Sequence, residues 1–419
     1  MSGNGKKGKI LVVGAGASGI TAAVEASEAG CEVVLVEKNP YVGGRVVQMN
    51  QYFPKLCPPM CGMEISLRRL RANGKIQTMT LAEVEKITGE PGNYHVTIKQ
   101  HPRFVNENCT LCGDCVPVCP VERPNAFNWG MDKTKAIYLP YEQAHPQKFV
   151  IDPDVCEGTS CNKCVEVCQY KAIDLEEKPS TVEMDFHAVV FATGWQPYDA
   201  AKIENLGFGK YPNVITNVMM ERLASDGGPT EGKIARPSDG KGIESIAFVQ
   251  CAGSRDENYL KYCSGVCCAA SLKQASYVRE QYPDAQVYMF YIDRRTPGRL
   301  EDFLQEREAD EKITLIKGKV AKIEEDQATK DLTVEAEDVL GGGRVHQKVG
   351  MVVLATGIVP SEINAELPAE LVRDEHGFLV AEQGQPGLLA AGCSKRPVEV
   401  AASVRDAVGT ALKALQNCV

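Results

Sequence analysis

The chain has 419 residues, of which 44% are hydrophobic and 24% are charged; this is an ordinary globular composition, long enough for two or three domains. Its net charge of −9 argues against nucleic acid as a partner, and no stretch approaches the roughly 20 apolar residues that a membrane-spanning helix needs. The first residues, MSGNGKKGKILVVG, do not resemble a signal peptide. Seventeen cysteines without an export signal indicate metal and redox chemistry in a reducing cytoplasm rather than disulfide bonds.

The first predicted elements form a dinucleotide-binding unit. An apolar strand at residues 9–13 runs into the turn Gly14-Ala15-Gly16-Ala17-Ser18-Gly19, and residues 20–29 are predicted to form an alanine-rich helix. In this context Gly14 makes the tight turn, Gly16 lets the backbone approach a pyrophosphate, and Gly19 allows close helix packing. Taken alone, the glycine motif would also fit a bare structural turn.

The next strand strengthens this interpretation. Residues 32–36 are predicted to form a strand, and Glu37 at its end is placed to accept hydrogen bonds from a ribose. Gly43-Gly44-Arg45 follows as a second phosphate contact. We therefore expect a bound dinucleotide at this end of the chain.

Two cysteine runs follow. The first contains Cys109, Cys112, Cys115 and Cys119, and the second contains Cys156, Cys161, Cys164 and Cys168. The first run has the spacing of bacterial ferredoxins, in which the fourth thiolate ligates the other cluster of a pair. We therefore expect one [4Fe-4S] cluster on the first three cysteines with Cys168, and a second on Cys156, Cys161 and Cys164 with Cys119. Zinc is the alternative, but neither run divides into the two short knuckles of a tetrahedral site.

The two runs form an internal repeat, because Phe-Val precedes each run and Lys-Ala-Ile follows each, as a two-cluster ferredoxin of duplicated halves requires. The second run departs from the pattern, with four residues between Cys156 and Cys161, and with Gln169 where proline is usual. The repeat lies between predicted strands 94–99 and 181–186, which we expect to be neighbours. An insertion between them should leave the parent fold intact, with the clusters attached to it as a module.

Three later segments are short apolar strands that end in a turn: Val189–Gly194 and Val352–Gly357, both ending in Ala-Thr-Gly, and Leu388–Gly392. This series resembles the two-dinucleotide flavoprotein family that includes thioredoxin reductase. The resemblance implies an FAD domain, a nested NAD(P)H domain, and a C-terminal helix at about residues 398–415 that approaches the flavin. The family usually has Asp after the last glycine, whereas this chain has Cys393, which leaves that cofactor contact open.

The nested domain lacks the expected nicotinamide motif. Its first strand, residues 245–249, is followed by Gln250-Cys251-Ala252-Gly253-Ser254-Arg255-Asp256 instead of a glycine fingerprint. We infer that NAD(P)H does not bind there. Cys251, Cys263, Cys267 and Cys268 meet at one strand end and one helix start, either as ligands of a third cluster or as small buried residues.

The remaining cysteines carry weaker signals. Cys57 and Cys61 are candidates for a redox dithiol facing the flavin, an auxiliary ligand or a structural pair, while Cys31 and Cys418 are expected to be inert. The six histidines are scattered, so no catalytic acid or base is expected.

Together these residues resemble the heterodisulfide reductase A-type (HdrA) family. The resemblance rests on the inserted Cys-Pro-Val-Glu-Arg-Pro-Asn at residues 119–125, the Gln250–Asp256 segment, Tyr262-Cys263-Ser264 and the Cys267-Cys268 pair. The chain begins at the flavin domain and stops at its last helix. This short form, with segments 52–59, 217–224 and 290–293, resembles the A-type flavoprotein of the quinone-interacting membrane-bound oxidoreductase complex in particular.

The resemblance implies a cytoplasmic protein that is attached to the inner membrane through its partners. Those partners would be a second related flavoprotein, a membrane haem b and iron–sulfur subunit, and adenylylsulfate (APS) reductase as electron partner. It also implies that Lys273 approaches the flavin, where a cation would stabilise the reduced form. A solvated helix face is the alternative for Lys273.

These observations predict an α/β, thioredoxin-reductase-like two-dinucleotide-binding flavoprotein fold with an inserted ferredoxin-like domain for two [4Fe-4S] clusters, and a third cluster as an open alternative. The expected domains are FAD-binding segments 1–100, 179–200 and 356–419, an iron–sulfur insert at 101–178, and a degenerate NAD-binding-like domain at 201–355. The expected metal ligands are the twelve cysteines of the three groups above. The expected FAD contacts are Gly14, Gly16, Ala17, Ser18, Gly19, Glu37, Lys38, Gly44, Arg45, Val84, Thr193, Gly194, Lys273 and Gly392.

The predicted function is an FAD and iron–sulfur electron-transfer component of a membrane-associated, quinone-linked complex, relaying electrons between menaquinone and APS reductase. One alternative is the HdrA-like component of a soluble heterodisulfide reductase-type complex. A second is an NADPH-dependent FAD and iron–sulfur reductase like the small subunit of glutamate synthase, and a third is a scaffold with structural metal and a vestigial flavin site.

Overall fold

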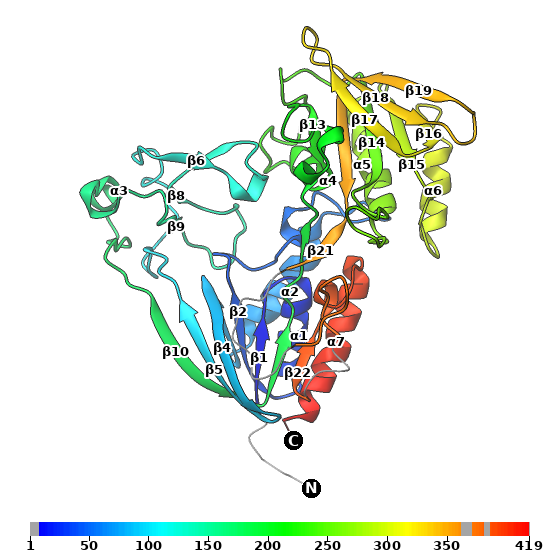
Figure 1. The fold of residues 1–419 in the computed structure, drawn as a ribbon. Helices are drawn as coiled ribbons and strands as arrows, with labels where there is room; N and C mark the ends of the chain where they lie inside the picture. Colours follow the sequence, from blue (N-terminus) through cyan, green and yellow to red (C-terminus); the bar gives the residue numbers. More distant parts are fainter. Residues whose placement is uncertain (1–7, 362–370, 381–385, 419) are drawn as a thin grey trace. The chain divides into compact units, whose positions relative to one another are not determined.

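The computed structural model describes residues 8–361, 371–380 and 386–418. The prediction that the chain has no signal peptide rests largely on residues 1–7, which lie outside these ranges. The chain folds into two compact units (Figure 1). The first comprises Met1–Val47, Met60–Trp195 and Pro360–Val419, and the second comprises Gln48–Pro59 and Gln196–Val359. Residues 48–59 therefore belong to the second unit, although the sequence placed them within the FAD-binding segment 1–100.

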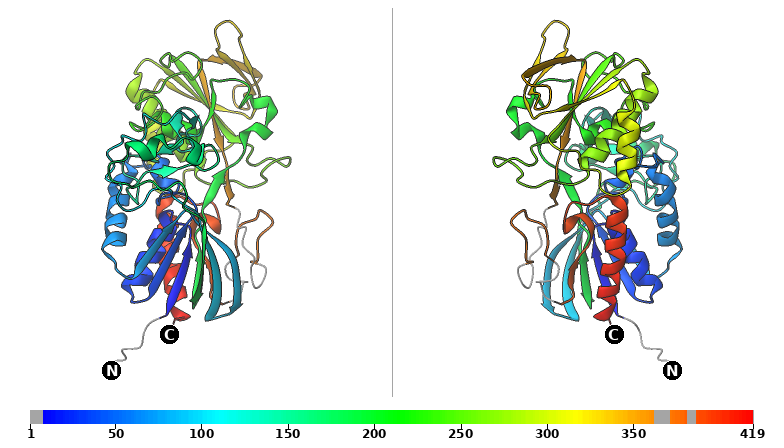
Figure 2. Two further views of the ribbon diagram at one scale, coloured as in Figure 1. Left: turned by 90° about the vertical axis from the view of Figure 1, so that its left-hand side faces the viewer. Right: turned by 90° about the vertical axis from the view of Figure 1, so that its right-hand side faces the viewer.

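A parallel sheet forms the centre of the first unit. Its strands in spatial order are β22 (Leu388–Ala390), β11 (Ala188–Phe191), β1 (Lys9–Val13), β2 (Glu32–Glu37) and β3 (Ile76–Thr80). Strands β1, β2 and β11 are apolar runs, because helices pack against the sheet and a small antiparallel sheet shares the core on its other face. Helices α1 (Ala17–Glu28) and α7 (Val400–Gln416) pack against each other and against the sheet, and α2 (Pro59–Ala72) precedes β3 (Figure 2).

A small antiparallel sheet completes the flavoprotein part of this unit. Its strands in spatial order are β10 (Ser180–Phe186), β5 (Asn93–Gln100) and β4 (Ala82–Glu90). Tyr94 pairs with Phe186 and Lys99 with Thr181, so the strands predicted to be neighbours are neighbours. The cysteine-rich insert lies between them.

The insert has little regular structure. Its elements are β6 (Glu122–Pro124) paired with β7 (Lys133–Lys135), β8 (Ile137–Tyr138) paired with β9 (Val150–Ile151), α3 (Lys163–Val167), and the 3-10 turns η2 (Ala126–Asn128) and η3 (Gly158–Ser160). A small core contains Val105, Ile137, Phe149, Ile151 and Ile173, against which several cysteines pack. With so few strands, this core alone is small for an independent domain.

Aromatic side chains join the insert to the loop after β2. The rings of Phe127 and Tyr141 stack with centroids 5.0 Å apart, and the Tyr41 ring meets them edge-on at 5.6 and 5.5 Å. The Val42 N–H donates to the His145 carbonyl at 2.9 Å. The insert is therefore part of the first unit and is held there by more than its two connecting strands.

The second unit contains another parallel sheet. Its strands in spatial order are β13 (Val214–Thr216), β20 (Met351–Thr356), β14 (Ser245–Ala252), β15 (Gln286–Tyr291) and β16 (Ile313–Lys317). The chain order reverses between β20 and β14, and open sheets bind ligands outside the carboxyl ends of their strands at such a point. The other elements are α4 (Asn217–Leu223), α5 (Cys267–Gln281), α6 (Leu300–Glu308) and the antiparallel sheet of β17 (Val320–Glu325), β18 (Leu332–Glu337) and β19 (Arg344–Val349).

Two short strands, β12 (Trp195–Pro197) and β21 (Ile358–Pro360), pair where the chain passes from one unit to the other. The remaining 3-10 turns are η1 (Val46–Gln48), η4 (Ala200–Lys202), η5 (Glu204–Leu206) and η6 (Gly392–Ser394). Over the described ranges, none of the helices combines the length and apolarity required to cross a membrane.

Candidate cofactor sites

The turn between β1 and α1 has the shape of a pyrophosphate cradle. Gly14 has φ +100°, and a side chain there would collide with the Ala192 carbonyl, while a side chain at Gly19 would collide with the Gly14 carbonyl. A Cβ at Gly16 would instead have only the Gly44 Cα as a neighbour, at 3.9 Å. Two glycines therefore allow close packing, and the third leaves space for a ligand at the helix N-terminus. Ala17 and Ser18 form the first turn of α1.

Glu37 is buried and braces this turn. Its Oε2 accepts from the Ala15 N–H at 2.7 Å, and its Oε1 accepts from the Asn39 N–H at 2.9 Å and the Asn39 Nδ2 at 2.7 Å. Burial raises the pKa of Glu37, and these hydrogen bonds oppose that shift. Because a carboxylate has about four lone-pair sites, room remains for one more donor, such as a ribose hydroxyl.

The loop after β2 closes over the turn. The Gly43 N–H donates to the Ala15 carbonyl at 2.7 Å, and Gly44 has φ +58°. The Arg45 guanidinium stacks over the Trp129 ring at 4.6 Å, and burial lowers its pKa. The Arg45 side chain is therefore held by the insert, a contact that the sequence does not predict. Lys38 lies beside Glu37 and is exposed.

Four other expected FAD contacts, Val84, Thr193, Gly194 and Gly392, are dispersed over the first unit. The Thr193 Oγ1 is buried and lacks a hydrogen-bond partner among the described residues, which suits a hydroxyl that meets a ligand; Gly194 follows with φ +72°. A side chain at Gly392 would collide with the Ser18 hydroxyl, so the last turn lies directly over the start of α1. Val84, in β4, packs against the apolar core.

Asp406 is a residue that sequence reasoning missed. Its Oδ2 accepts from the Gly392 N–H at 2.8 Å, and its Oδ1 pairs with the Lys395 Nζ at 2.8 Å. It thereby places a carboxylate from α7 beside the turn where the family has Asp and this chain has Cys393. The Cys393 thiol is buried and lies 3.4 Å from the Val398 carbonyl. No sequence signal marked Asp406, because it lies in an otherwise ordinary amphipathic helix.

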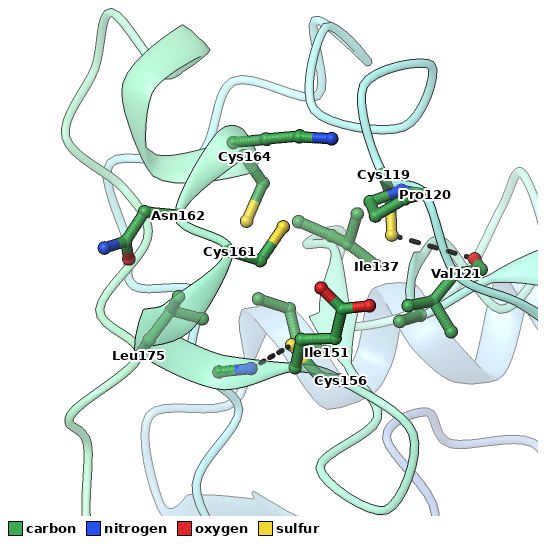
Figure 3. A pocket seen from close by; sticks show the side chains of 14 residues that line it. Cys119, Pro120, Val121, Ile137, Ile151, Cys156, Cys161, Asn162, Cys164 and Leu175 are labelled. Atoms are coloured by element: carbon green, nitrogen blue, oxygen red, sulfur yellow. Dashed lines mark hydrogen bonds between the residues drawn. The ribbon is translucent and has the colours of Figure 1, made fainter.

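The structure gathers the eight cysteines of the insert into two cavities. One cavity is lined by Cys109, Cys112, Cys115 and Cys168, and the other by Cys119, Cys156, Cys161 and Cys164. In the second, the Cys161 and Cys164 sulfurs approach the hollow from the α3 side and the Cys119 sulfur approaches from across it (Figure 3). Each cavity thus combines three cysteines of one run with the last cysteine of the other.

Backbone N–H groups point at the thiols of both cavities. The Gly158 N–H donates to the Cys156 Sγ and the Ala172 N–H to the Cys168 Sγ, each at 3.4 Å. Burial raises the pKa of Cys115 to about 12 and that of Cys164 to about 11. These thiols therefore need a bound cation or cluster to ionise at neutral pH.

A third cavity lies in the second unit, at the carboxyl end of β14 and the start of α5. It is lined by Cys251, Cys263, Cys267 and Cys268 with Ser254, Arg255, Ser264, Gly265, Asp293 and Arg295. The Gly265 N–H donates to the Cys263 Sγ at 3.4 Å, as in the other two cavities. Burial raises the pKa of Cys251 to about 11 and also raises that of Cys267. Cys251 has φ +56°, a conformation that is uncommon outside glycine and is found at functional sites.

The thiols line these cavities rather than converging on a point. In the part of the chain with assigned positions, no group of three Cys, His, Asp or Glu side chains could hold one metal ion. A tetrahedral zinc ion needs sulfurs about 2.3 Å from a single centre. Four thiolates around one cavity match the ligand set of a [4Fe-4S] cluster.

Lys273 is buried within the second unit, not on a solvated helix face. Its side chain is 1% exposed, and its Nζ lies 2.9 Å from the Glu221 Oε1 and 2.6 Å from the Gln51 carbonyl. Glu221 also accepts from the Asn50 N–H at 2.9 Å and from the Gln274 Nε2 at 2.6 Å. This network fastens residues 48–59 to α4 and α5.

The remaining cysteines are all free thiols. Cys57 belongs to the second unit and Cys61 to the first. Cys31 and Cys418 lie at opposite ends of the chain but are hydrogen-bonded to each other, and burial followed by the Cys31 contact raises the pKa of Cys418 to about 12. A thiol with a raised pKa is a poor nucleophile, as expected for an inert residue.

Comparisons with protein families and with solved structures agree with the predicted flavoprotein fold. A family model described as FAD dependent oxidoreductase matches residues 9–109, which carry the glycine turn and Glu37. Thioredoxin reductase from T. acidophilum is similar with a TM-score of 0.53, covering 99% of each chain at 13% identity. That from Lactococcus lactis has a TM-score of 0.54, covers 98% of this chain and 99% of its own, and is 14% identical. The predicted thioredoxin-reductase-like α/β fold is confirmed, and the chain carries an FAD-dependent oxidoreductase domain.

Curated relatives are more similar in sequence. An A-type iron-sulfur subunit of the CoB–CoM heterodisulfide reductase of Methanopyrus kandleri is 39% identical over 420 residues, covering 97% of this chain and 64% of its own length. The A-type subunit of the ferredoxin/F(420)H(2)-dependent CoB-CoM heterodisulfide reductase of Methanosarcina acetivorans is 37% identical over 420 residues, covering 97% and 53%. The chain thus spans between about half and about two thirds of these relatives. These relatives confirm the expected resemblance to the HdrA family.

Proposed function

We propose that this chain is an electron-transfer protein that exchanges electrons between an FAD and partner proteins through three [4Fe-4S] clusters, as the HdrA-like component of a heterodisulfide reductase-type complex. One observation carries the proposal: four cysteines surround each of three cavities, in a chain that also has the FAD-binding turn. The names of the relatives support it, because they describe subunits of heterodisulfide reductases, one of them an iron-sulfur subunit.

The chain's own residues would hold these groups in place. FAD supplies exchange between two-electron and one-electron chemistry, and clusters pass single electrons. The pyrophosphate would lie in the space beside Gly16, at the N-terminus of α1. Glu37 would accept a hydrogen bond from one ribose hydroxyl. Apolar residues around the insert cavities, such as Ile137 and Ile151, would keep water from the sulfurs. The N–H donors to Cys156, Cys168 and Cys263 would stabilise thiolate charge.

A narrower version of the proposal places the chain in a quinone-linked complex. It rests on segments 52–59, 217–224 and 290–293. The chain would then lie in the cytoplasm, attached to the inner membrane through a haem b and iron–sulfur subunit, with a second related flavoprotein and APS reductase as partners. The relatives described above favour the heterodisulfide reductase-type complex instead, and purification of the native complex would distinguish the two by its haem b content and its partner subunits.

Anaerobic cofactor analysis tests the proposal. The purified chain should contain one FAD and about twelve irons, four for each cluster. The Cys267→Ser variant should lose about four irons and keep its FAD, whereas Cys31→Ser should lose neither. Zinc in place of iron, or a chain without FAD, would contradict the proposal. About eight irons in the wild type, enough for two clusters, would contradict only the third cluster.

A further inference from the structure

The third cavity differs from the other two in the charges that line it. The cavity of Cys109, Cys112, Cys115 and Cys168 is lined by one carboxylate, Asp114, and the other insert cavity by Glu157 and Lys163. The third is lined by two guanidinium groups, Arg255 and Arg295, and one carboxylate, Asp293. Of the three, it alone has an excess of positive charge among its lining residues.

Both the guanidinium and the backbone N–H of Arg255 have partners that hold the residue in this cavity. Its Nη2 lies 2.7 Å from the Asp293 Oδ2, and its backbone N–H donates to the Tyr262 carbonyl at 3.2 Å. An arginine guanidinium stays protonated in proteins, so Arg255 is a permanent charge, and the ion pair with Asp293 sets its position.

The second guanidinium nitrogen of Arg255 has no acceptor. Its Nη1 is buried and lacks a hydrogen-bond partner among the residues that the structure describes. A buried donor without a partner is costly, and native proteins rarely leave one unless something else occupies the site. Arg255 lines the same cavity as Cys251, Cys263, Cys267 and Cys268. The acceptor that fits is therefore a sulfur or sulfide of a bound cluster.

We propose that Arg255, aided by Arg295, makes the cluster in the third cavity the most easily reduced of the three. This inference rests on the proposed function. Reduction would add one electron to the third cluster, delivered by the flavin or by a reduced partner protein, with no bond made or broken and no proton required. The reduced cluster carries one more negative charge, so a fixed cation in hydrogen-bonding contact stabilises it more than the oxidised form and raises its midpoint potential. Arg255 is thus an electrostatic tuning residue.

A redox titration followed by electron paramagnetic resonance, on the anaerobically purified full chain, tests this. The signal lost in Cys263→Ser identifies the third cluster. In the wild type its midpoint potential should be the highest of the three. In Arg255→Gln that potential should fall while the other two stay unchanged, and Arg255→Lys, which keeps the charge, should restore most of it.

Two further variants keep the test decisive. Arg236→Gln, which removes a buried ion-paired arginine of the same unit that does not line the cavity, should leave all three potentials unchanged. If Arg255→Gln loses iron, Arg295→Gln should show a smaller fall in the same potential. An unchanged potential in iron-replete Arg255→Gln, or a third cluster that is harder to reduce than the others, would overturn the inference. A wild type with no third signal would instead show that the proposed third cluster is wrong.

Discussion

At the residue scale, Glu37 has more than one task. Its two oxygens already accept three hydrogen bonds, from the backbone of Ala15 and from the backbone and side chain of Asn39. The carboxylate therefore fixes the glycine turn first and offers only its remaining lone pair to a ligand. The position of Glu37 in the sequence motif predicted a contact with the ligand, but it did not predict the hydrogen bonds to Ala15 and Asn39.

Replacing Glu37 by Gln should weaken FAD binding. An amide has only one acceptor oxygen, so its NH2 group would face a backbone N–H and the ribose would lose a charged acceptor. Loss of a hydrogen bond to a charged group costs about 1.5–3 kcal/mol, or roughly 10- to 150-fold in affinity. Titrating the deflavinated protein with FAD would measure this, with Glu32→Gln, at the exposed start of the same strand, as the matched control. An equal affinity for both variants would contradict the role of Glu37.

Removing the Lys273 ammonium should destabilise the second unit. The Lys273→Met substitution leaves the Glu221 carboxylate buried without its countercharge, which costs about 3–5 kcal/mol. The double variant Glu221→Gln/Lys273→Met should recover part of this, because no charge then remains buried. Urea unfolding would report both effects, and Lys261→Met, which breaks an exposed pair with Glu257, should shift stability by about 1 kcal/mol or less. A double variant no more stable than the single one would show that the pair is not coupled.

At the element scale, the aromatic contacts of the insert determine how it meets the flavoprotein part. Tyr41 follows β2, and Phe127 and Tyr141 belong to the insert, so the three rings join segments from two parts of the chain. The insertion point could be predicted from the sequence, because the flanking strands have clear apolar alternation. The anchor could not, since aromatic residues in irregular loops carry no periodicity.

Truncating the central ring should loosen the insert. Phe127→Leu removes two aromatic pairs, each worth about 0.5–1.5 kcal/mol beyond buried area, so we expect a loss of roughly 1–3 kcal/mol. Native-state hydrogen exchange should show faster opening at residues 126–141 without faster opening of β1 or β2. Leu340→Ala, on a side chain that is 73% exposed, should change nothing measurable. Uniformly faster exchange throughout the first unit would argue against a local anchor.

Cysteine spacing predicted which side chains would share a cavity more reliably than it predicted what surrounds them. Motif spacing reports local geometry, and three of the four cysteines of each insert cavity lie within one short run. Arg255, Asp406 and Trp129 contact their sites through tertiary packing, which leaves no local pattern in the sequence. The assignment of residues 48–59 to the second unit was missed for the same reason, because Glu221 and Lys273, which hold them, lie far along the chain.

At the scale of the whole molecule, the second unit keeps a dinucleotide-binding architecture with a cysteine-lined cavity at its switch point. Cys251 occupies the end of β14, where the pyrophosphate turn of a nicotinamide site would be needed. The fold is thus similar to thioredoxin reductase over nearly the whole chain, while the turn that would define its electron donor differs.

Neither NADPH nor NADH should reduce the flavin of this chain. Anaerobic mixing with either nucleotide should leave the flavin absorbance unchanged, whereas dithionite should bleach it. Thioredoxin reductase bleached by NADPH under the same conditions serves as the control. Rapid bleaching by NADPH would place the chain among the self-sufficient reductases.

The path of the chain through its two units also has a consequence during synthesis. Residues 48–59 leave the ribosome early but find their buried partners only when α4 and α5 appear. The central sheet of the first unit is incomplete until β22 is made, and α7, which packs on α1, comes later still. Neither unit is a continuous stretch of chain, so no nascent fragment can finish one before the other has begun. We therefore expect flavin to be loaded after translation of α7, and we expect a prematurely terminated chain to expose unpaired strands to proteases instead of folding as a smaller flavoprotein.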